Sequence, residues 1–443
     1  MTGSLTLAAQ AAYILRDNST GVITKASPSL YPHQWSWDAG FNAIGLAVVD
    51  LPRARQELDA LFVGQWRNGM VPHIVFDPVA TGYWPGPEQW LCSRHSRQAP
   101  KLPATSGITD PPVHAIAIAR ILEVAAAHGG RDTAETMQWA ADIYPRALAW
   151  HRFLARERAD KVTGLMTLFH GWESGTDNSP RWDVPYGNVI PGPDLPAYIR
   201  KDKAHVSDAD QRPTDLEYDR YVWLCEEAKR AGYDSATLRR TGSFRVGDVL
   251  FTAIYAAASD LLADLAVRLR EPGAAELREY AAQARAAVLC HVDEASGLAA
   301  DVDLRTGEWL RTETCAGFAP LIAGHVPDEM RHRLTDLLLG ERWCGHPALK
   351  LPLPPSTSPC SPAFNPACYW RGPVWPVFNW LLIWALRRDG EEVLADKLST
   401  VAIAELEDGT YAEYYHALTG EPLGSHNQSW TAAVALDWLL AND

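Results

Sequence analysis

The sequence predicts an all-α fold, in which helices form a closed double ring and long loops gather at one end. Apolar residues recur at helical spacing along most of the 443 residues. The expected helices come in pairs joined by short turns, and long segments rich in Gly, Pro and Trp separate the pairs. No repeat typical of an open solenoid is legible, which favours a closed arrangement over an extended superhelix.

Several of the expected helices have a start signal. Proline suits the first turn of a helix, because its φ angle is already helical and its missing N–H is not needed there. Pro52, Pro112, Pro272 and Pro327 stand at or just before such a turn. In chain order, the expected helices span residues 5–17, 39–49, 52–67, 112–128, 133–157, 215–231, 246–269, 273–290, 314–323, 328–339, 374–388, 391–406 and 427–440.

Extended structure is predicted to be scarce, with residues 71–76 and 298–304 as the strand-like stretches. The longest connecting segments are 18–38, 68–111, 158–214, 292–313 and 340–373. Loops of such length in a compact domain usually carry function. We therefore expect a single barrel domain over residues 1–443, without an interdomain linker, and with lid or cap loops around 68–111 and 172–214.

Composition and charge exclude several classes of function. The 47% of hydrophobic and 21% of charged residues are typical of a globular protein with a large core. The net charge of −14 and the scattered Arg and Lys residues argue against a nucleic-acid partner, which would need a basic stripe. No apolar run approaches the roughly 18 residues of a membrane span. The N-terminus also lacks the basic and apolar regions of a signal peptide.

These patterns predict a cytoplasmic protein without a membrane partner, and they leave assembly into a homo-oligomer open. The seven cysteines include no CxxC pair and are odd in number. Neither a zinc site nor a disulfide framework is expected from them. We expect no metal and no other cofactor.

The 18 tryptophans are unusual in where they stand. Many lie beside Gly, Pro, Ser or Asp in segments without periodicity, which favours clefts over the core. Flat aromatic rings cover the apolar faces of a sugar, while carboxylates hold its hydroxyls or act on its glycosidic bond. Four segments combine aromatic rings with charged groups in this way: residues 31–38, 171–179, 369–376 and 411–415.

These segments supply four candidate carboxylates: Asp38, Glu173, Asp177 and Glu413. Glycoside hydrolysis needs one acid to protonate the leaving oxygen and a second carboxylate to activate water or to attack directly. Asp177 lies in a polar turn, where an Asx turn or a helix N-cap explains it equally well. Asp38 opens an expected helix, so we expect an N-cap role there, with which binding of a sugar hydroxyl is compatible. The tyrosines around Glu413 indicate a cleft wall.

Five motifs occur between residues 31 and 430, and their order along the chain is informative. They are Trp-Ser-Trp-Asp, Trp-Glu-Ser-Gly-Thr-Asp-Asn-Ser, Tyr-Trp-Arg-Gly-Pro-Val-Trp-Pro, Tyr-Ala-Glu-Tyr-Tyr and His-Asn-Gln-Ser-Trp. In this order they resemble glycoside hydrolase family 63, which is similar to trehalases and glucoamylase-like enzymes. The resemblance covers nearly the whole chain. It implies a six-fold α/α barrel, the (α/α)6 toroid, and an inverting α-glycosidase with Asp177 as general acid and Glu413 as general base.

Within the family, the chain resembles short bacterial members that split a sugar from glycerate, and most of all the glucosylglycerate hydrolases. No additional β domain is expected. The resemblance implies a sugar pocket lined by aromatic and polar side chains. Its expected members are Tyr31, Trp35, Trp37, Asp38, Trp172, Tyr369, Trp370, Trp375 and Gln428.

The glycerate carboxylate needs a cation and hydroxyl donors. We expect Arg212 to be the cation, with Tyr218 and Tyr83 beside it, although a surface ion pair explains Arg212 equally well. Arg371 is an alternative cation. Its motif also occurs in relatives with neutral substrates, which favours a structural or sugar-binding role.

The predicted activity is hydrolysis of the small glycoside glucosylglycerate to glucose and glycerate. Mannosylglycerate, or a neutral α-glucoside such as trehalose, is the alternative substrate. The alternative from another class is a non-catalytic sugar-binding barrel, which would not need both Asp177 and Glu413. A terpenoid-cyclase-like barrel is disfavoured because the chain lacks a clear aspartate-rich metal motif. The sequence does not decide between glucose and mannose, which differ only in configuration at C2.

Overall fold

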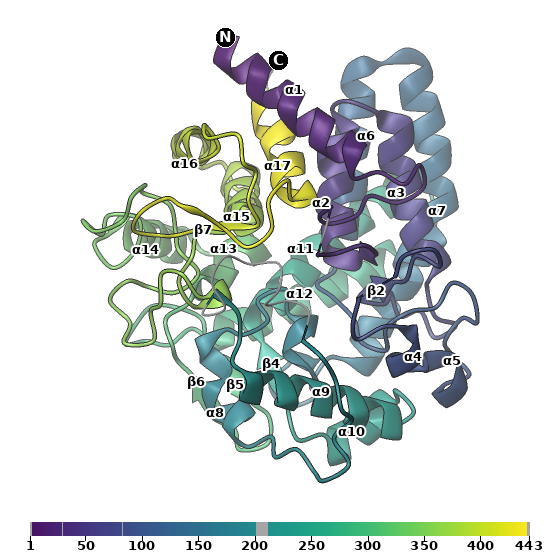
Figure 1. Cartoon of the computed structure of the whole chain (residues 1–443). Coiled ribbons are helices and arrows are strands. Elements are labelled where there is room, and N and C mark those ends of the chain that lie inside the picture. Colours follow the sequence, from purple (N-terminus) through teal and green to yellow (C-terminus); the bar gives the residue numbers. More distant parts are fainter. Residues whose placement is uncertain (1, 29, 82, 201–210, 441–443) are drawn as a thin grey trace.

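The computed structural model describes residues 2–28, 30–81, 83–200 and 211–440 (Figure 1). Within this part of the chain, six inner helices form a ring. They are α2 (Ser36–Ala47), α6 (His114–His128), α11 (Val249–Leu269), α13 (Ala319–Ala323), α15 (Pro376–Arg388) and α17 (Ser429–Leu440). Each packs against the next in this order, and α17 packs against α2, so the ring closes.

A second layer of helices surrounds the ring. Here α1 (Thr2–Asp17) packs on α17, α3 (Leu51–Val63) on α2, α7 (Gly130–Glu157) on α6, α12 (Ala274–Cys290) on α11, and α16 (Glu392–Glu405) on α15. The sixth, α14 (Asp328–Leu339), follows α13 in the chain. The predicted α/α toroid is thereby confirmed.

Burial patterns explain why each helix takes its layer. All twelve residues of α2 are buried, and a helix that is mostly apolar and buried on every side belongs inside the fold. In α12, by contrast, the buried positions Leu277, Ala281, Ala284 and Val288 form one stripe. Such a stripe covers a neighbour on one side and leaves the other side to solvent, as the outer layer requires.

Helix α11 meets the length and mean hydropathy of a membrane-spanning helix, although the sequence analysis found no apolar run of that kind. In its most apolar window, 83% of the residues are buried inside the protein. The helix lies in the inner ring, where its apolar surface contacts α6, α12 and α13. Its composition is therefore explained by its place in the core.

Short antiparallel strands pair with one another in and next to the long connecting segments. Strand β1 (Gln34–Trp35) pairs with β2 (Ile74–Val75), and β7 (Tyr414–Tyr415) pairs with β8 (Pro422–Leu423). A four-stranded sheet has the order β3 (Met166–Leu168), β4 (Val246–Asp248), β5 (Asp301–Asp303) and β6 (Glu308–Leu310). The strand-like stretches 71–76 and 298–304 contain β2 and β5. Residues 246–248 were expected to be helical but form β4.

Further helices lie outside the two layers. They are α4 (Pro87–Trp90), α5 (Cys92–His95), α8 (Asp183–Gly187), α9 (Asp215–Arg230) and α10 (Ser235–Thr241), with 3-10 turns η1 (Gly171–Glu173), η2 (Pro180–Trp182), η5 (Cys315–Phe318) and η6 (Tyr369–Arg371). The expected lid loops 68–111 and 172–214 also contain residues 82 and 201–210, which lie outside the described residues.

The expected start of the first inner helix is wrong. Helix α2 begins at Ser36 after an extended Trp35, so Trp35 occupies the N-cap position and Asp38 lies in the first turn. Asp38 is therefore not an N-cap. Its carboxylate still lies near the positive end of the helix dipole, which favours negative charge there.

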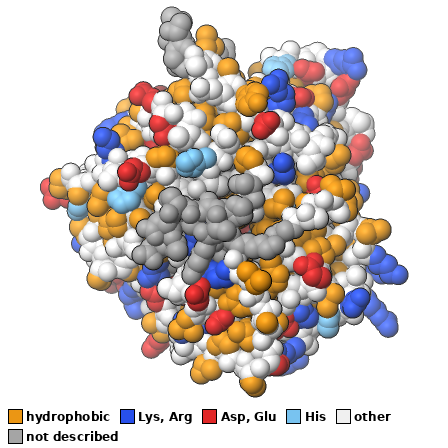
Figure 2. Space-filling model, viewed as in Figure 1, with side chains coloured by type: hydrophobic (Ala, Val, Ile, Leu, Met, Phe, Trp, Pro, Cys, Tyr) orange, Lys and Arg blue, Asp and Glu red, His pale blue; other side chains and the backbone are white. Residues whose placement is uncertain are grey.

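On the face shown in Figure 2, the described acidic and basic side chains are interspersed. On that face, the described charges of neither sign gather into a stripe.

Candidate active site

A cavity of about 310 Å³ opens at the end of the toroid where the inner helices begin. Its lining comes from the start of α2, the segment before α6, the segment before α15 and the start of α17. These four starting ends therefore lie at one side of the ring. The volume of this cavity falls within the range of small-molecule pockets.

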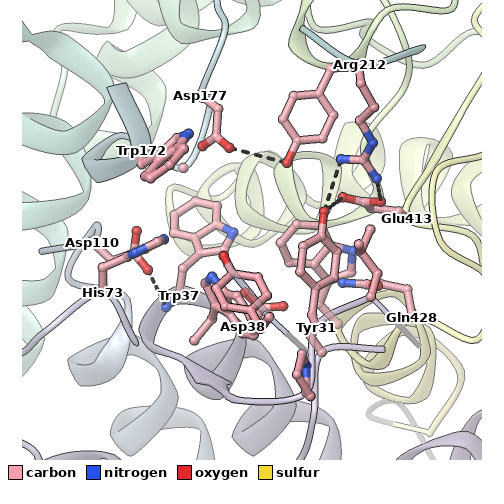
Figure 3. Close-up of a pocket in the computed structure, with 18 of the residues that line it drawn as sticks. Tyr31, Trp37, Asp38, His73, Asp110, Trp172, Asp177, Arg212, Glu413 and Gln428 are labelled. Atoms are coloured by element: carbon pink, nitrogen blue, oxygen red, sulfur yellow. Dashed lines mark hydrogen bonds and ion pairs between the residues drawn. The ribbon is translucent and has the colours of Figure 1, made fainter. Parts of the chain in front are cut away.

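Most of the predicted site residues line this cavity. They are Tyr31, Trp35, Trp37, Asp38, Tyr83, Trp172, Asp177, Arg212, Tyr218, Tyr369, Trp370, Glu413 and Gln428. The fold thus brings together side chains from segments that are up to almost 400 residues apart in sequence, and Figure 3 shows several of them pointing into one space.

Two residues of the Tyr-Trp-Arg-Gly-Pro-Val-Trp-Pro motif that were considered for the site, Trp375 and Arg371, do not line the cavity. Trp375, contrary to expectation, stacks behind Trp370 with ring centroids 3.8 Å apart, and its Nε1 donates to the carbonyl of Tyr369 at 3.1 Å. Arg371 forms a two-pronged ion pair with Asp183, both N–O distances being 2.7 Å. Trp375 therefore supports the wall, and Arg371 has a structural role.

Glu173 is completely buried and lies outside the cavity. Its two carboxylate oxygens accept from the guanidinium of Arg158 at 2.6 and 2.9 Å. They also accept from the backbone N–H groups of Phe169 at 2.7 Å and Thr109 at 3.2 Å. A carboxylate so fully bonded holds the loop of Asp177 in place and is not available for chemistry.

A second buried ion pair anchors the same loop on its other side. Arg181 donates to Asp301 of β5 at 3.0 Å, and the indole of Trp182 donates to the other oxygen of Asp301 at 3.1 Å. Asn178, next to Asp177, accepts from the backbone N–H of Trp370 at 3.1 Å. Asp177 is thus carried by a loop that is tied down at both ends.

The carboxyl of Asp177 faces the cavity and accepts from the hydroxyl of Tyr369 at 3.3 Å (Figure 3). Burial raises its pKa to about 7, and the negative charge of Glu413 acts in the same direction, while the hydrogen bond from Tyr369 lowers it. The N-cap of the following turn η2 is Ser179, so Asp177 is not needed as a helix cap.

Glu413 is buried just before β7 and receives three hydrogen bonds. Its Oε1 accepts from the Tyr31 hydroxyl at 3.0 Å, and its Oε2 accepts from Arg212 at 2.7 Å and from the backbone N–H of Ser425 at 3.0 Å. Gly424, with φ +71°, makes this close approach feasible, because a Cβ there would lie 2.4 Å from Oε2. Donors of this kind stabilise the ionised carboxylate.

Arg212 is the one Arg or Lys among the described residues of the cavity lining. It donates to Glu413 and, through Nη1, to the Tyr31 hydroxyl at 3.0 Å, and its guanidinium lies 4.8 Å from the centre of the Tyr369 ring. Burial lowers the pKa of Arg212, but the combined attraction of Glu413 and the surrounding tyrosines raises it well above the usual value. The ion pair considered in the sequence analysis exists, but it is buried, with Arg212 only 5% exposed.

Asp38 presents a buried Oδ1 that has no hydrogen-bond partner. Burial, followed by the charge of Glu413, raises its pKa well above the usual range. Buried polar atoms are rarely left unpaired, so an unpaired one beside a cavity indicates the position of a ligand hydroxyl.

Several lining residues were not predicted from the sequence, among them His73, Trp84, Asp110, Tyr221 and Trp430. Asp110 accepts from the backbone N–H of Trp37 at 3.1 Å and stands just before α6. Asp110 could have been predicted from the sequence. Pro112 marks the start of that helix, and several site residues stand at the starts of inner helices.

His73 gave no such signal. Burial lowers its pKa to about 3, so it is neutral, and its Nδ1 has no partner. Among the described residues, no group of three or more His, Cys, Asp or Glu side chains is placed to hold a metal ion.

Comparison with known proteins gives concordant matches. The family model for the mannosylglycerate hydrolase MGH1-like glycoside hydrolase domain matches residues 31–431. The glucosylglycerate hydrolase of Mycolicibacterium hassiacum is 50% identical over 435 residues, covering 98% of this chain and 97% of that protein. The mannosylglycerate hydrolase of Thermus thermophilus is 41% identical over 430 residues, covering 97% and 99%.

Among solved structures, the family 63 mannosylglycerate hydrolase of Thermus thermophilus in complex with Tris and D-glycerate matches with a TM-score of 0.88. Its sequence identity to this chain is 39%, and the match covers 98% of this chain and 99% of that one.

Proposed function

The chain belongs to the MGH1-like glycoside hydrolases of family 63, and from this premise we propose that it hydrolyses glucosylglycerate to glucose and glycerate with inversion at the anomeric carbon. It is a glycoside hydrolase. The observation that carries the finer assignment is a pair of carboxyl groups, Asp177 and Glu413, that line one cavity in opposite surroundings.

Asp177 is the general acid. Its pKa of about 7 keeps it largely protonated below neutral pH, as a proton donor to the glycosidic oxygen must be. Glu413 is the general base, since its three donors hold it as a carboxylate that can take a proton from water. The water oxygen then bonds to the anomeric carbon as the bond to the leaving oxygen breaks.

Inversion requires room for that water between the two carboxyl groups, which inverting enzymes place about 6.5–9.5 Å apart. We predict a separation in this range for Asp177 and Glu413.

The sugar ring occupies the aromatic part of the cavity. Trp37, Trp172 and Trp370 offer flat faces, and the unpaired Oδ1 of Asp38 accepts from a sugar hydroxyl. The segment 68–111 supplies Tyr83 and Trp84 to the wall, and we assign it the role of lid.

The acidic half of the substrate is supported by Arg212. A chain with a net charge of −14 repels a small carboxylate at a distance, so binding one requires a local cation. Arg212 meets that need and would have nothing to recognise in trehalose. Tyr218 and Tyr83 line the same cavity and supply hydroxyls for glycerate.

The second candidate is mannosylglycerate, favoured by the family model and by the Thermus thermophilus relative. Identity is higher to the glucosylglycerate hydrolase, at 50% against 41%, which supports glucose. A non-catalytic barrel would have no reason to keep both carboxyl groups. The free thiols of all seven cysteines agree with a cytoplasmic location, which belongs to the same proposal.

A substrate panel tests the function. Purified protein is incubated with glucosylglycerate, mannosylglycerate, glucosylglycerol and trehalose, and ¹H NMR follows the anomer released first. We expect glucosylglycerate to have the highest kcat/KM and to release β-glucose before mutarotation. Early α-glucose would contradict inversion, and a preference for mannosylglycerate or trehalose would contradict the substrate.

A further inference from the structure

The carboxylate of Glu413 is held by hydrogen bonds from within the protein. Both of its oxygens accept hydrogen bonds, and the shortest, 2.7 Å, comes from the guanidinium of Arg212. A buried guanidinium at that distance strongly stabilises negative charge on a carboxylate. While this ion pair is in place, the positive charge of Arg212 opposes the transfer of a proton from water to Glu413.

Arg212 therefore has two competing partners. It is the counter-ion of Glu413, and it is the only Arg or Lys among the described lining residues that can meet an acidic substrate. Its Nη1 and Nη2 are both used within the protein, and its Nε is buried without a partner. A substrate carboxylate that binds Arg212 must share it with Glu413 or take it away.

We propose that Arg212 couples the charge of the leaving group to the strength of the base: the substrate's carboxylate draws the guanidinium from Glu413, and this makes Glu413 competent to deprotonate water. The inference deepens the proposed function and rests on it, because it takes Glu413 as the base and an acid as the leaving group. A neutral glycoside leaves the Arg212–Glu413 pair intact and is cleaved slowly even when it is bound.

Tyr31 acts as a positioning residue for the carboxylate of Glu413. Its hydroxyl accepts from Arg212 at 3.0 Å and donates to Oε1 of Glu413 at 3.0 Å. With the backbone N–H of Ser425 on Oε2, it holds the carboxylate in orientation after the guanidinium has moved. The ring of Tyr369, 4.8 Å from the Arg212 guanidinium, provides a surface on which the cation remains stabilised.

The proton balance of the step is simple. One proton passes from water to Glu413, the water oxygen bonds to the anomeric carbon, and the proton of Asp177 passes to the leaving oxygen as its bond to that carbon breaks. Arg212 stays protonated throughout and changes only its partner. Specificity for an acid then appears in kcat as well as in KM, because the charge acts on the chemical step.

The test separates the anion from the sugar. α-Glucosyl fluoride is hydrolysed with and without added D-glycerate, because fluoride leaves without needing the acid and its rate reports on the base. At saturating fluoride substrate, we expect glycerate to raise kcat saturably by about tenfold, since removing an adjacent opposite charge makes a carboxylate a markedly stronger base. Neutral glycerol should have no such effect.

Three variants sharpen the result. In Arg212→Gln the hydrolysis of glucosyl fluoride should no longer respond to glycerate. In Arg371→Gln, which removes an arginine that is ion-paired outside the cavity, the response should persist. Tyr31→Phe should keep the response with a lower kcat and little change in the KM for the fluoride.

Glycerate that only inhibits wild-type hydrolysis of glucosyl fluoride, or leaves its kcat unchanged, would overturn the coupling. Activation that persists in Arg212→Gln would overturn it as well. The comparison of glycerate with glycerol uses the wild-type protein, so it stands even if Arg212→Gln does not fold. Failure to cleave glucosylglycerate itself would instead count against the proposed function, and that measurement is made separately.

Discussion

Asp177 and Glu413 line the same cavity and differ in almost every contact they make. Asp177 receives a single side-chain hydrogen bond at 3.3 Å, and burial raises its pKa to about 7. Glu413 receives three hydrogen bonds, one of them from a buried guanidinium. Two carboxyl groups of nearly identical intrinsic chemistry therefore stand in opposite surroundings, and this contrast supports the proposed roles of Asp177 as acid and Glu413 as base.

The largest expected effect tests both halves of this comparison at once. Asp177→Ala and Glu413→Ala should each lower kcat on glucosylglycerate by about 10²–10⁴-fold, because each removes one proton-transfer group. Steady-state kinetics measure the loss, and the exposed Asp194→Ala is the control. Retention of more than about a tenth of the wild-type rate by either variant would remove that residue from its role.

The same two variants should separate on glucosyl fluoride. Fluoride needs little protonation to leave, so Asp177→Ala should recover much of its activity on this substrate while Glu413→Ala should not. Equal activity of the two variants on the fluoride would show that acid and base have been assigned to the wrong residues.

The second prediction concerns stability, where the two sites should respond with opposite signs. Glu413→Gln leaves the buried Arg212 without its counter-ion and should lower the free energy of unfolding by about 3–5 kcal/mol. Asp177→Asn should raise it near neutral to alkaline pH, because a folded-state pKa of about 7 means that ionising Asp177 costs folding energy.

The sign and range of the Asp177 effect follow from the two pKa values. Below the unfolded value of 3.8 both states hold the proton, so wild type and Asp177→Asn should be equally stable. The wild type loses stability as pH rises from there until about 7, up to about 4 kcal/mol at 1.36 kcal/mol per unit, and less where cavity water screens the charge. Urea denaturation at about pH 4 and pH 8 measures the difference; a constant gap would contradict it.

The third prediction is a pH profile. Because Asp177 must hold its proton, kcat/KM for glucosylglycerate should fall about tenfold per unit above a pH of about 7. The alkaline limb should be much weaker for glucosyl fluoride, for which the acid is dispensable. If kcat/KM fell equally steeply with rising pH on both substrates, the titration would belong to a group other than Asp177.

The smallest expected effect comes from the one hydroxyl that contacts Asp177. The hydrogen bond from Tyr369 lowers the pKa of Asp177, so Tyr369→Phe should raise it and move the alkaline limb to higher pH. Tyr415→Phe, outside the cavity lining, is the control. A limb that stays in place or moves down would show that Tyr369 does not set the protonation of the acid.

Periodicity and motif order predicted much of this molecule correctly. Helices such as α12 and α14 end within a residue of their expected bounds, because an apolar stripe repeats locally and can be read from neighbouring positions. The short strands were harder to predict. Gln34 of β1 pairs with Val75, and a two-residue strand has no pattern of its own without that distant partner.

Within a single motif, the local sequence does not show which side chains face the cavity. Trp370 and Trp375 stand five residues apart and stack on each other, yet Trp370 faces the cavity and Trp375 lies behind it. Glu173 and Asp177 are four residues apart, and one is held by Arg158 while the other faces the substrate space. Neither difference can be predicted from residue types, because each depends on which residues, distant in the sequence, pack against the side chain.

The sequence by itself determined the all-α class, the pairing of helices and the carboxyl groups to consider, because these follow from spacing and from motifs that are contiguous in the chain. Only the tertiary structure decided that Arg212 is bonded to Glu413, a residue 201 positions away. It also decided that Asp38 has an unpaired oxygen and that Asp177 titrates near 7. Burial and hydrogen bonding are relations between distant residues, and they take definite values only when the ring of helices closes.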